Sequence, residues 1–220
     1  MTRNVLLATV EGRLLLVALL LTGALVAALA VSWWFVPDRT LTYIAMTGLN
    51  LVIGRAAGMS FGYASGLGHD EVIPWNVIVE TLQVLVVYPL FALGWKHLLD
   101  TSRWAAAMSR LQAAAEEQRG AIQRYGIAGL FVFVFTPFWL TGAGVGAIIG
   151  LLIGLRTRTI LAVVLAATYI AICVWALLLN ELSAWAAAWS HYAPFALVVA
   201  FVLIALSGRL IRRLPPHHRG

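Results

Sequence analysis

Two long apolar stretches of this chain, residues 41–67 and 127–155, are interrupted in the middle by residues that break or polarise a helix. The interruptions are Gly54, Arg55 and Gly58 in the first stretch and Pro137, Thr141, Gly142 and Gly144 in the second. The Lys and Arg residues around each stretch place both of its ends on one side of a membrane, because basic residues collect on the cytoplasmic side. We therefore expect two re-entrant hairpins, in which paired short helices enter the membrane and return to the same side.

The composition is that of an integral membrane protein. Of the 220 residues, 62% are hydrophobic and 11% are charged, whereas charged residues make up about 25% of an average soluble domain. Apolar runs long enough to cross a hydrocarbon core of about 30 Å recur along the chain. We therefore expect an all-α, polytopic fold that forms a single membrane domain over residues 1–220.

The net charge of +6 fits the same class. The basic residues lie beside the apolar spans, where they orient a membrane protein and contact anionic lipid headgroups. We therefore expect the lipid bilayer, and not nucleic acid, to be the partner of these charges.

The positive-inside rule predicts a full topology. Arg3 and Arg13 place the N-terminus in the cytoplasm, together with the basic segment 95–124 and the basic tail 212–220. The first hairpin then opens to the outside, the second opens to the cytoplasm, and residues 180–191 form an outside loop. The predicted full spans of the cytoplasmic (inner) membrane are residues 14–36, 73–94, 159–179 and 192–211.

The first predicted span must be distinguished from a signal peptide. Ala28-Leu29-Ala30 resembles a cleavage site. However, the apolar run continues beyond it into Trp33 and Trp34, a pair of aromatic anchors typical of a membrane boundary. We therefore expect the segment to be retained as a span.

The segment 95–124 carries an amphipathic pattern. Its apolar residues recur at helical steps of three, four or seven: Trp104, Met108, Leu111, Ala115 and Ile122. The pattern predicts a helix lying along the cytoplasmic interface and drawn to anionic headgroups. A docking face for a soluble or membrane partner is an alternative that the pattern leaves open.

The two hairpins enter from opposite faces and each is followed by a full span, which predicts two halves related by inverted topology. Residue identity between the halves is limited to Gly-x-x-x-Gly-like spacing in both hairpins. A hairpin tip leaves backbone groups unpaired, so it must be packed in protein or face a wet cavity. Two tips that meet near the midplane would direct helix N-termini into a polar pocket suited to an anion or a substrate headgroup.

The second hairpin carries a specific motif. Residues 136–147 read Thr-Pro-Phe-Trp-Leu-Thr-Gly-Ala-Gly-Val-Gly-Ala and follow Arg124-Tyr125-Gly126. This motif resembles the second hairpin of the small multidrug export proteins, a family distantly similar to the DedA superfamily of membrane transporters. The first hairpin of that family is matched in part by residues 54–60. The resemblance covers roughly residues 45–175 and implies an integral, transport-type membrane protein.

The chain departs from the family pattern at three places. Gly54 replaces an acidic residue beside Arg55, Met59-Ser60 replaces a proline, and Trp139 replaces a second proline. The missing carboxylate bears directly on whether transport is coupled to protons.

A substitute carboxylate lies on the following helix. Asn76, Glu80 and Gln83 form a polar row on one helix face, and Glu80 has a predicted depth in the membrane similar to that of Arg55. Our hypothesis is that Arg55 and Glu80 pair across a cavity and form an ion or substrate relay, because ionisable groups within the membrane are costly and usually functional. An equally weighted interpretation is a buried ion pair that only fixes the first hairpin.

The second hairpin contributes further candidate substrate- or ion-binding residues, namely Thr136, Pro137, Thr141 and Gly142. A structural role is the alternative for this group. Threonines can satisfy freed backbone carbonyls, and glycines allow helices to pack closely without contacting a substrate.

No catalytic residues, metal ligands or cofactors are predicted. The sequence has no His-Glu-x-x-His motif, no Gly-Lys-Ser/Thr phosphate loop and one cysteine, Cys173, within an apolar helix. We therefore expect no enzyme, but a secondary-type transporter or flippase for a small amphiphilic or anionic solute. The alternative is a non-transporting accessory or assembly subunit of a larger membrane complex. A homodimer is a further expectation, drawn by analogy with opposed-hairpin folds.

Overall fold

The computed structural model describes residues 9–94, 126–136, 142–189, 199 and 203, and all of their regular secondary structure is helical. The amphipathic segment 95–124 lies outside the described residues, and so do all but two residues of the predicted span 192–211. The structure therefore tests neither prediction. The described helices are α2 (Val10–Phe35), α3 (Pro37–Val52), α4 (Arg55–Ala64), α5 (His69–Gly94), an unlabelled helix (Gly126–Phe135), α7 (Ala143–Leu152) and α8 (Thr157–Trp189).

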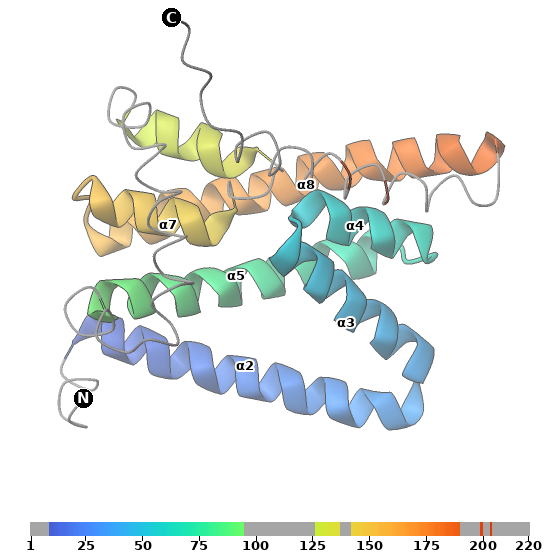
Figure 1. The fold of residues 1–220 in the computed structure, drawn as a ribbon, viewed down its shortest axis with the longest axis horizontal. Coiled ribbons are helices and arrows are strands. Elements are labelled where there is room, and N and C mark those ends of the chain that lie inside the picture. Colours follow the sequence, from blue (N-terminus) through green and yellow to red (C-terminus); the bar gives the residue numbers. More distant parts are fainter. Residues whose placement is uncertain (1–8, 95–125, 137–141, 190–198, 200–202, 204–220) are drawn as a thin grey trace, which may run out of the picture.

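Three of these helices, α2, α5 and α8, are long and apolar enough to cross a membrane. They run in alternating directions, so that each is antiparallel to the next (Figure 1). The start of α2 follows from its sequence, because the Thr9 side chain accepts a hydrogen bond from the Gly12 amide at 3.1 Å. Its end is set by Pro37, which begins α3 at a position where proline is favoured.

Helix α8 is longer than predicted. The sequence predicted a span over 159–179 followed by an outside loop over 180–191, but the helix continues to Trp189. That loop assignment was wrong over most of its length. The physical reason is that residues 180–189 contain neither glycine nor proline and include several good helix formers, so nothing in them ends the helix.

The first interrupted stretch folds into two short helices, α3 and α4, which pack on each other. The break lies at Gly54, whose φ of 132° and ψ of 167° are essentially restricted to glycine. The sequence predicted a helix break at Gly58 as well, and that prediction was wrong. Gly58 lies within α4, where a Cβ would be 2.8 Å from the Met46 carbonyl oxygen. Gly58 therefore permits the close approach of α4 to α3.

The second interrupted stretch contains the helix Gly126–Phe135 and then α7. The residues between them, 137–141, lie outside the described residues. Gly142 is the residue that precedes the first turn of α7, and Gly144 lies inside α7, where a Cβ would be in ordinary contact with Val87 at 3.5 Å. Gly144 therefore does not break α7, and a small side chain would fit at this position.

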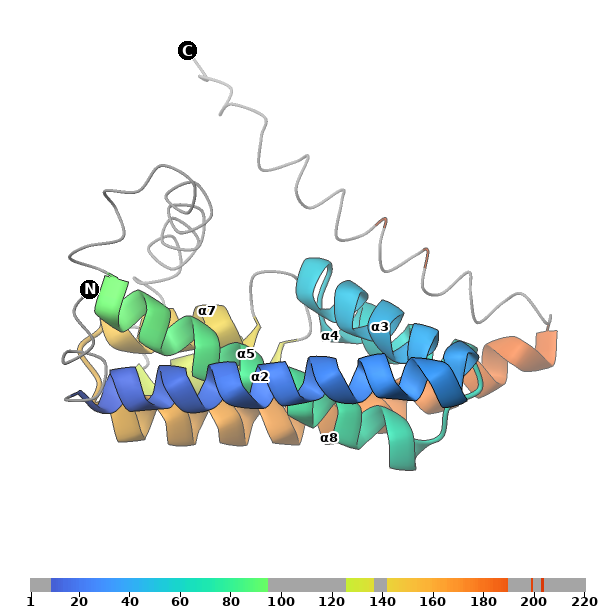
Figure 2. The same cartoon turned by 90° about the horizontal axis from the view of Figure 1, so that it is seen from below.

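Two apolar clusters hold the short helices against α5 and α8. In the cluster around α4, Met59 and Tyr63 pack with Val72, near the start of α5, and with Ile172, in the middle of α8. In the cluster around α7, residues 147–149 pack with the second half of α5 and the first half of α8. Figures 1 and 2 show α4 and α7 at different positions along these two long helices. Each short helix thus covers one half of the α5–α8 pair.

The backbone at the end of α4 recurs at the end of α7, 88 positions later. Gly66 and Gly154 both have positive φ, at 84° and 81°. The Leu67 amide donates to the Gly62 carbonyl at 3.1 Å, and the Leu155 amide donates to the Gly150 carbonyl at the same distance. The two segments therefore have the same helix-terminating hydrogen bonds.

We predict that Gly54→Ala destabilises the protein. An alanine at this backbone conformation is strained by about 1–3 kcal/mol, so the melting temperature in detergent should fall. The matched control is Gly23→Ala on α2, because a Cβ there has nothing within 4 Å. The control should melt at or slightly above the wild-type temperature, since alanine is the better helix former. Equal melting temperatures for the two variants would contradict the strained turn.

Candidate functional site

A buried ion pair lies between the two apolar clusters. Arg55 is the first residue of α4, and Glu80 lies in the middle of α5. The Arg55 Nη2 atom is 2.9 Å from the Glu80 Oε2 atom, and only 2% of each side chain is exposed. The structure therefore brings together the two residues that the sequence placed at similar depth. Whether the pair acts as a relay remains a prediction.

Two asparagines extend the polar region toward α3. Asn50, near the end of α3, donates from Nδ2 to the Asn76 Oδ1 atom at 2.8 Å, and both residues are buried. Asn76 in turn donates to the carbonyl of Val72 at 2.7 Å. Because Asn76 is one turn before Glu80 on α5, these contacts place polar side chains from α3, α4 and α5 in one layer. We use the name polar layer for these four residues together with Ser60 and Thr168, the other buried polar residues of α4 and α8: Asn50, Arg55, Ser60, Asn76, Glu80 and Thr168.

The hydrogen bonding of the polar layer is incomplete. The Arg55 Nη2 and Glu80 Oε2 atoms form the ion pair. Four other buried side-chain atoms have no hydrogen-bond partner among the described residues, namely Arg55 Nη1, Ser60 Oγ, Glu80 Oε1 and Thr168 Oγ1. Such atoms are rare in folded proteins, and each costs about 1–3 kcal/mol when left unpaired. The layer is therefore suited to take up water, an ion or the polar group of a ligand.

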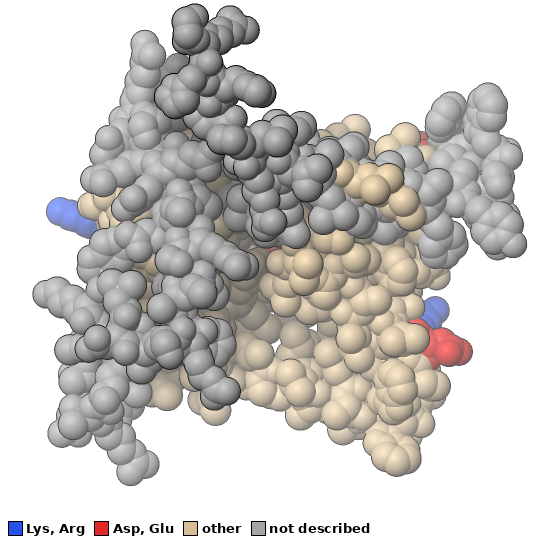
Figure 3. All heavy atoms as spheres, in the orientation of Figure 1, with Lys and Arg blue, Asp and Glu red and all other residues tan. Residues whose placement is uncertain are grey.

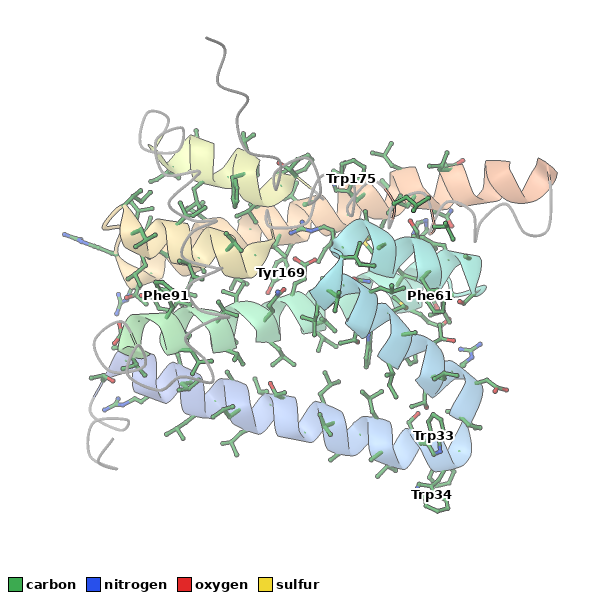
Figure 4. The ribbon with its side chains drawn as sticks, viewed as in Figure 1. Trp33, Trp34, Phe61, Phe91, Tyr169 and Trp175 are labelled. Atoms are coloured by element: carbon green, nitrogen blue, oxygen red, sulfur yellow. The ribbon has the colours of Figure 1, made fainter. Side chains whose placement is uncertain are left out.

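Thr168 lies one residue from a contact between α5 and α8. The hydroxyl groups of Thr81 and Tyr169, the next residues along each helix, are hydrogen-bonded at 2.8 Å. Figure 4 shows Tyr169 between α8 and α5. Thr168 is fully buried and lies on α8 between Val164, in the cluster around α7, and Ile172, in the cluster around α4.

The start of α4 adds to the positive potential of Arg55. Gly54 provides no side-chain cap for the first backbone amides of the helix, and these amides together with the helix dipole favour an anion. The Glu80 carboxylate is the anion found beside Arg55 in this structure. A solute carrying a carboxylate or similar group could take the same place only if the Glu80 carboxylate were displaced or neutralised.

The remaining predicted site residues are more dispersed. Gln83 is half-buried on α5. The Thr136 hydroxyl donates to the carbonyl of Val132, in the helix that precedes it, at 2.8 Å, as the structural interpretation predicts. Gly142 precedes α7, while Pro137 and Thr141 lie outside the described residues. The structure thus places Asn76 one turn before Glu80 on α5 and bonds it to Asn50.

Sequence analysis missed three members of the polar layer: Asn50, Ser60 and Thr168. Asn50 carried a usable signal, because an asparagine four residues before the glycine break is unusual in an apolar run. Thr168 carried no such signal. A single threonine in a membrane helix is common, since its hydroxyl can bond the carbonyl one turn earlier.

Polar contacts also tie the helices together at the two ends of the molecule. At one end, Glu71 on α5 accepts hydrogen bonds from Arg39 at 2.6 Å and from Tyr43 at 2.8 Å. At the other end, Tyr88 donates to Thr157 at 2.8 Å, and Thr157 donates to Glu11 at 3.2 Å. Figure 3 shows most of the visible charge at these ends, on either side of a broad uncharged band.

We predict that removing one partner of the buried ion pair is more damaging than removing both. Arg55→Met leaves the Glu80 carboxylate buried and unpaired, which costs about 3–5 kcal/mol. The double variant Arg55→Met with Glu80→Met should recover much of that loss, as measured by thermal or denaturant unfolding in detergent.

The control for this comparison is Arg39→Met. The Arg39 side chain is 64% exposed, so its ion pair with Glu71 is worth at most about 1 kcal/mol. If Arg55→Met were no more destabilising than Arg39→Met, the charged, buried state of the pair would be refuted.

Comparison with known proteins places the chain in a family. Residues 55–174, more than half of the chain, match the family described as "Putative small multi-drug export protein". The matched segment begins at Arg55 and ends within α8. It includes Glu80 and all of α7. No curated protein and no solved structure shows significant similarity to the chain. Together with the membrane-length helices, the family match shows that this chain is an integral membrane protein and belongs to the small multidrug export protein family.

Proposed function

We propose that the protein is a secondary-type transporter or flippase for a small amphiphilic or anionic solute, and that the polar layer binds the solute or a coupling ion. The observation that carries the proposal is the Arg55–Glu80 pair, which is buried, incompletely hydrogen-bonded and located at the start of a helix too short to cross a membrane. Ionisable groups within a membrane are costly and are usually retained for function. The family match supports transport in general and does not specify a solute.

The proposed architecture has four full spans and two re-entrant hairpins related as an inverted repeat. Both termini and the amphipathic helix 95–124 are then cytoplasmic. The lengths of α4 and α7 support the hairpins: each has 10 residues, which extend about 15 Å, or half of the hydrocarbon core. The shared backbone hydrogen bonds that follow α4 and α7 support the repeat. Membrane transporters commonly bind their substrates where such broken helices meet.

The proposed mechanism uses the different chemistry of the two charged groups. Arg55 keeps its positive charge, whereas a carboxyl such as Glu80 can accept a proton and become neutral. Protonation of Glu80 releases the Arg55 guanidinium, and an anionic group of the solute then pairs with it at the start of α4. The low exposure of both side chains corresponds to a closed state, in which the site is sealed from both sides of the membrane. No step in this scheme needs nucleotide hydrolysis.

The alternative is an accessory or assembly subunit that uses the fold without transport. The same sealed ion pair is compatible with a purely structural role, since buried pairs can fix one element against another. The two proposals differ in one measurable respect. Under the structural proposal, the protein moves no solute, and substitutions of the pair change only its stability.

We predict that liposomes containing the purified protein release carboxyfluorescein, an organic anion, faster than protein-free liposomes do when a pH gradient is imposed. Glu80→Gln and Arg55→Gln should each reduce release to the protein-free rate, because they remove the proton-accepting group and the anion-binding group. Arg39→Gln, which changes only an exposed ion pair, should retain the wild-type rate.

The same liposomes loaded with ethidium, an organic cation, test the choice of charge. Release of ethidium in place of carboxyfluorescein would overturn the assignment of an anionic solute. Identical rates for wild-type protein, Glu80→Gln and protein-free liposomes would reject the transport proposal itself and favour the accessory subunit.

A further inference from the structure

The α4–α5 and α7–α8 units are related by a constant offset in the sequence. Helix α4 begins at Arg55 and α7 at Ala143, while α5 begins at His69 and α8 at Thr157. Each second position follows the first by 88 residues, the offset that also relates the glycines of positive φ at 66 and 154. A residue in one unit therefore has a defined counterpart in the other.

The packing obeys the same offset. In the cluster around α4, helix α8 contributes Ile172, Ala176 and Leu179. In the cluster around α7, helix α5 contributes their counterparts, Val84, Tyr88 and Phe91. This exchange is what an approximate two-fold axis between the antiparallel α5 and α8 produces. Thr81 and Tyr169 are counterparts too, and their hydrogen bond lies where such an axis crosses the pair.

The counterpart of Glu80 is Thr168, and the counterpart of Arg55 is Ala143. One unit thus has a charged pair at these two positions, whereas the other has a threonine and an alanine. The two-fold relation places Thr168 on the same side of the α5–α8 pair as Glu80, one residue from the Thr81–Tyr169 contact.

The Thr168 hydroxyl differs in its hydrogen bonding from the hydroxyl groups of three other threonines in apolar segments. The hydroxyl groups of Thr22, Thr81 and Thr136 each donate to the carbonyl four residues earlier, at 2.6–2.8 Å. Thr168 is fully buried, yet its hydroxyl has no hydrogen-bond partner among the described residues. An unmet buried hydroxyl lowers stability, so a role for Thr168 other than folding is expected.

We infer that Thr168 is a solute-binding residue of the polar layer, and that its hydroxyl hydrogen-bonds the polar group of the solute that pairs with Arg55. The inference rests on the proposed function and deepens it by naming a neutral, hydrogen-bonding half of the site opposite the charged half. An oxygen-bearing anionic group suits both halves, because it accepts hydrogen bonds from a guanidinium and from a hydroxyl.

The test compares Thr168→Val, Thr168→Ser and Thr22→Val in the carboxyfluorescein assay and in thermal unfolding. Thr168→Val keeps the shape but removes the hydroxyl, so release should fall about tenfold, the effect of one lost hydrogen bond. Its melting temperature should equal or exceed that of the wild type, since an unmet buried group is removed. Thr168→Ser keeps the hydroxyl and should restore release. Thr22→Val is the control, because the Thr22 hydroxyl is already bonded within α2.

The outcomes separate this inference from the proposed function. If Glu80→Gln stops release while Thr168→Val releases at the wild-type rate, Thr168 binds no solute and the transport proposal stands. A lower melting temperature for Thr168→Val, with no rescue of release by Thr168→Ser, would assign the residue a structural role and overturn the inference. If wild-type protein releases no more dye than protein-free liposomes do, the transport proposal fails first.

Discussion

The structure depends on the fact that a 10-residue helix cannot cross a hydrocarbon core. Helices α4 and α7 each extend about half of that distance, so their starting ends must be buried in protein, because lipid offers no partner for free backbone amides. Both helices meet this requirement by packing against α5 and α8. In the proposed architecture, the long helices are the frame that allows such broken helices to lie within the membrane. The ion pair lies at the break between α3 and α4.

The ion pair depends on the packing of α4 against α5. A guanidinium in the middle of an apolar protein is tolerated only with a counter-ion close by, and Glu80 provides one from the neighbouring helix. The supporting asparagines come from α3 and α5, so three helices converge on one charge pair. Apolar clusters on both sides isolate it from the polar contacts at the two ends of the molecule. The stability of the hairpin and the chemistry of the candidate site are therefore tied to the same two residues.

The sequence predicted the helical class, three of the membrane-length helices, the break at Gly54 and the proximity of Arg55 to Glu80, because hydropathy, charge and glycine act locally or at a fixed depth. It did not predict the extension of α8, since no local breaker marks its end. It also missed Thr168, whose significance depends on a neighbour 88 positions away and on a hydroxyl left unpaired. Such relations between distant residues arise from tertiary packing and cannot be predicted from the periodicity of the sequence. Gly58 and Gly144 were predicted to break helices, but they lie within α4 and α7, and Gly58 instead allows α4 to approach α3 closely.

The account rests on hairpins that return to the side from which they enter, and single-cysteine labelling tests this most directly. In a Cys173→Ala background, cysteines replace Asp38 and Ser65, at the two ends of the first hairpin, and Arg156, at the end of the second; all three positions are exposed. A membrane-impermeant maleimide should label positions 38 and 65 from the same side of the membrane, and position 156 only from the other side. Labelling of positions 38 and 65 from opposite sides would mean that α3 and α4 together cross the membrane, and the account would be wrong.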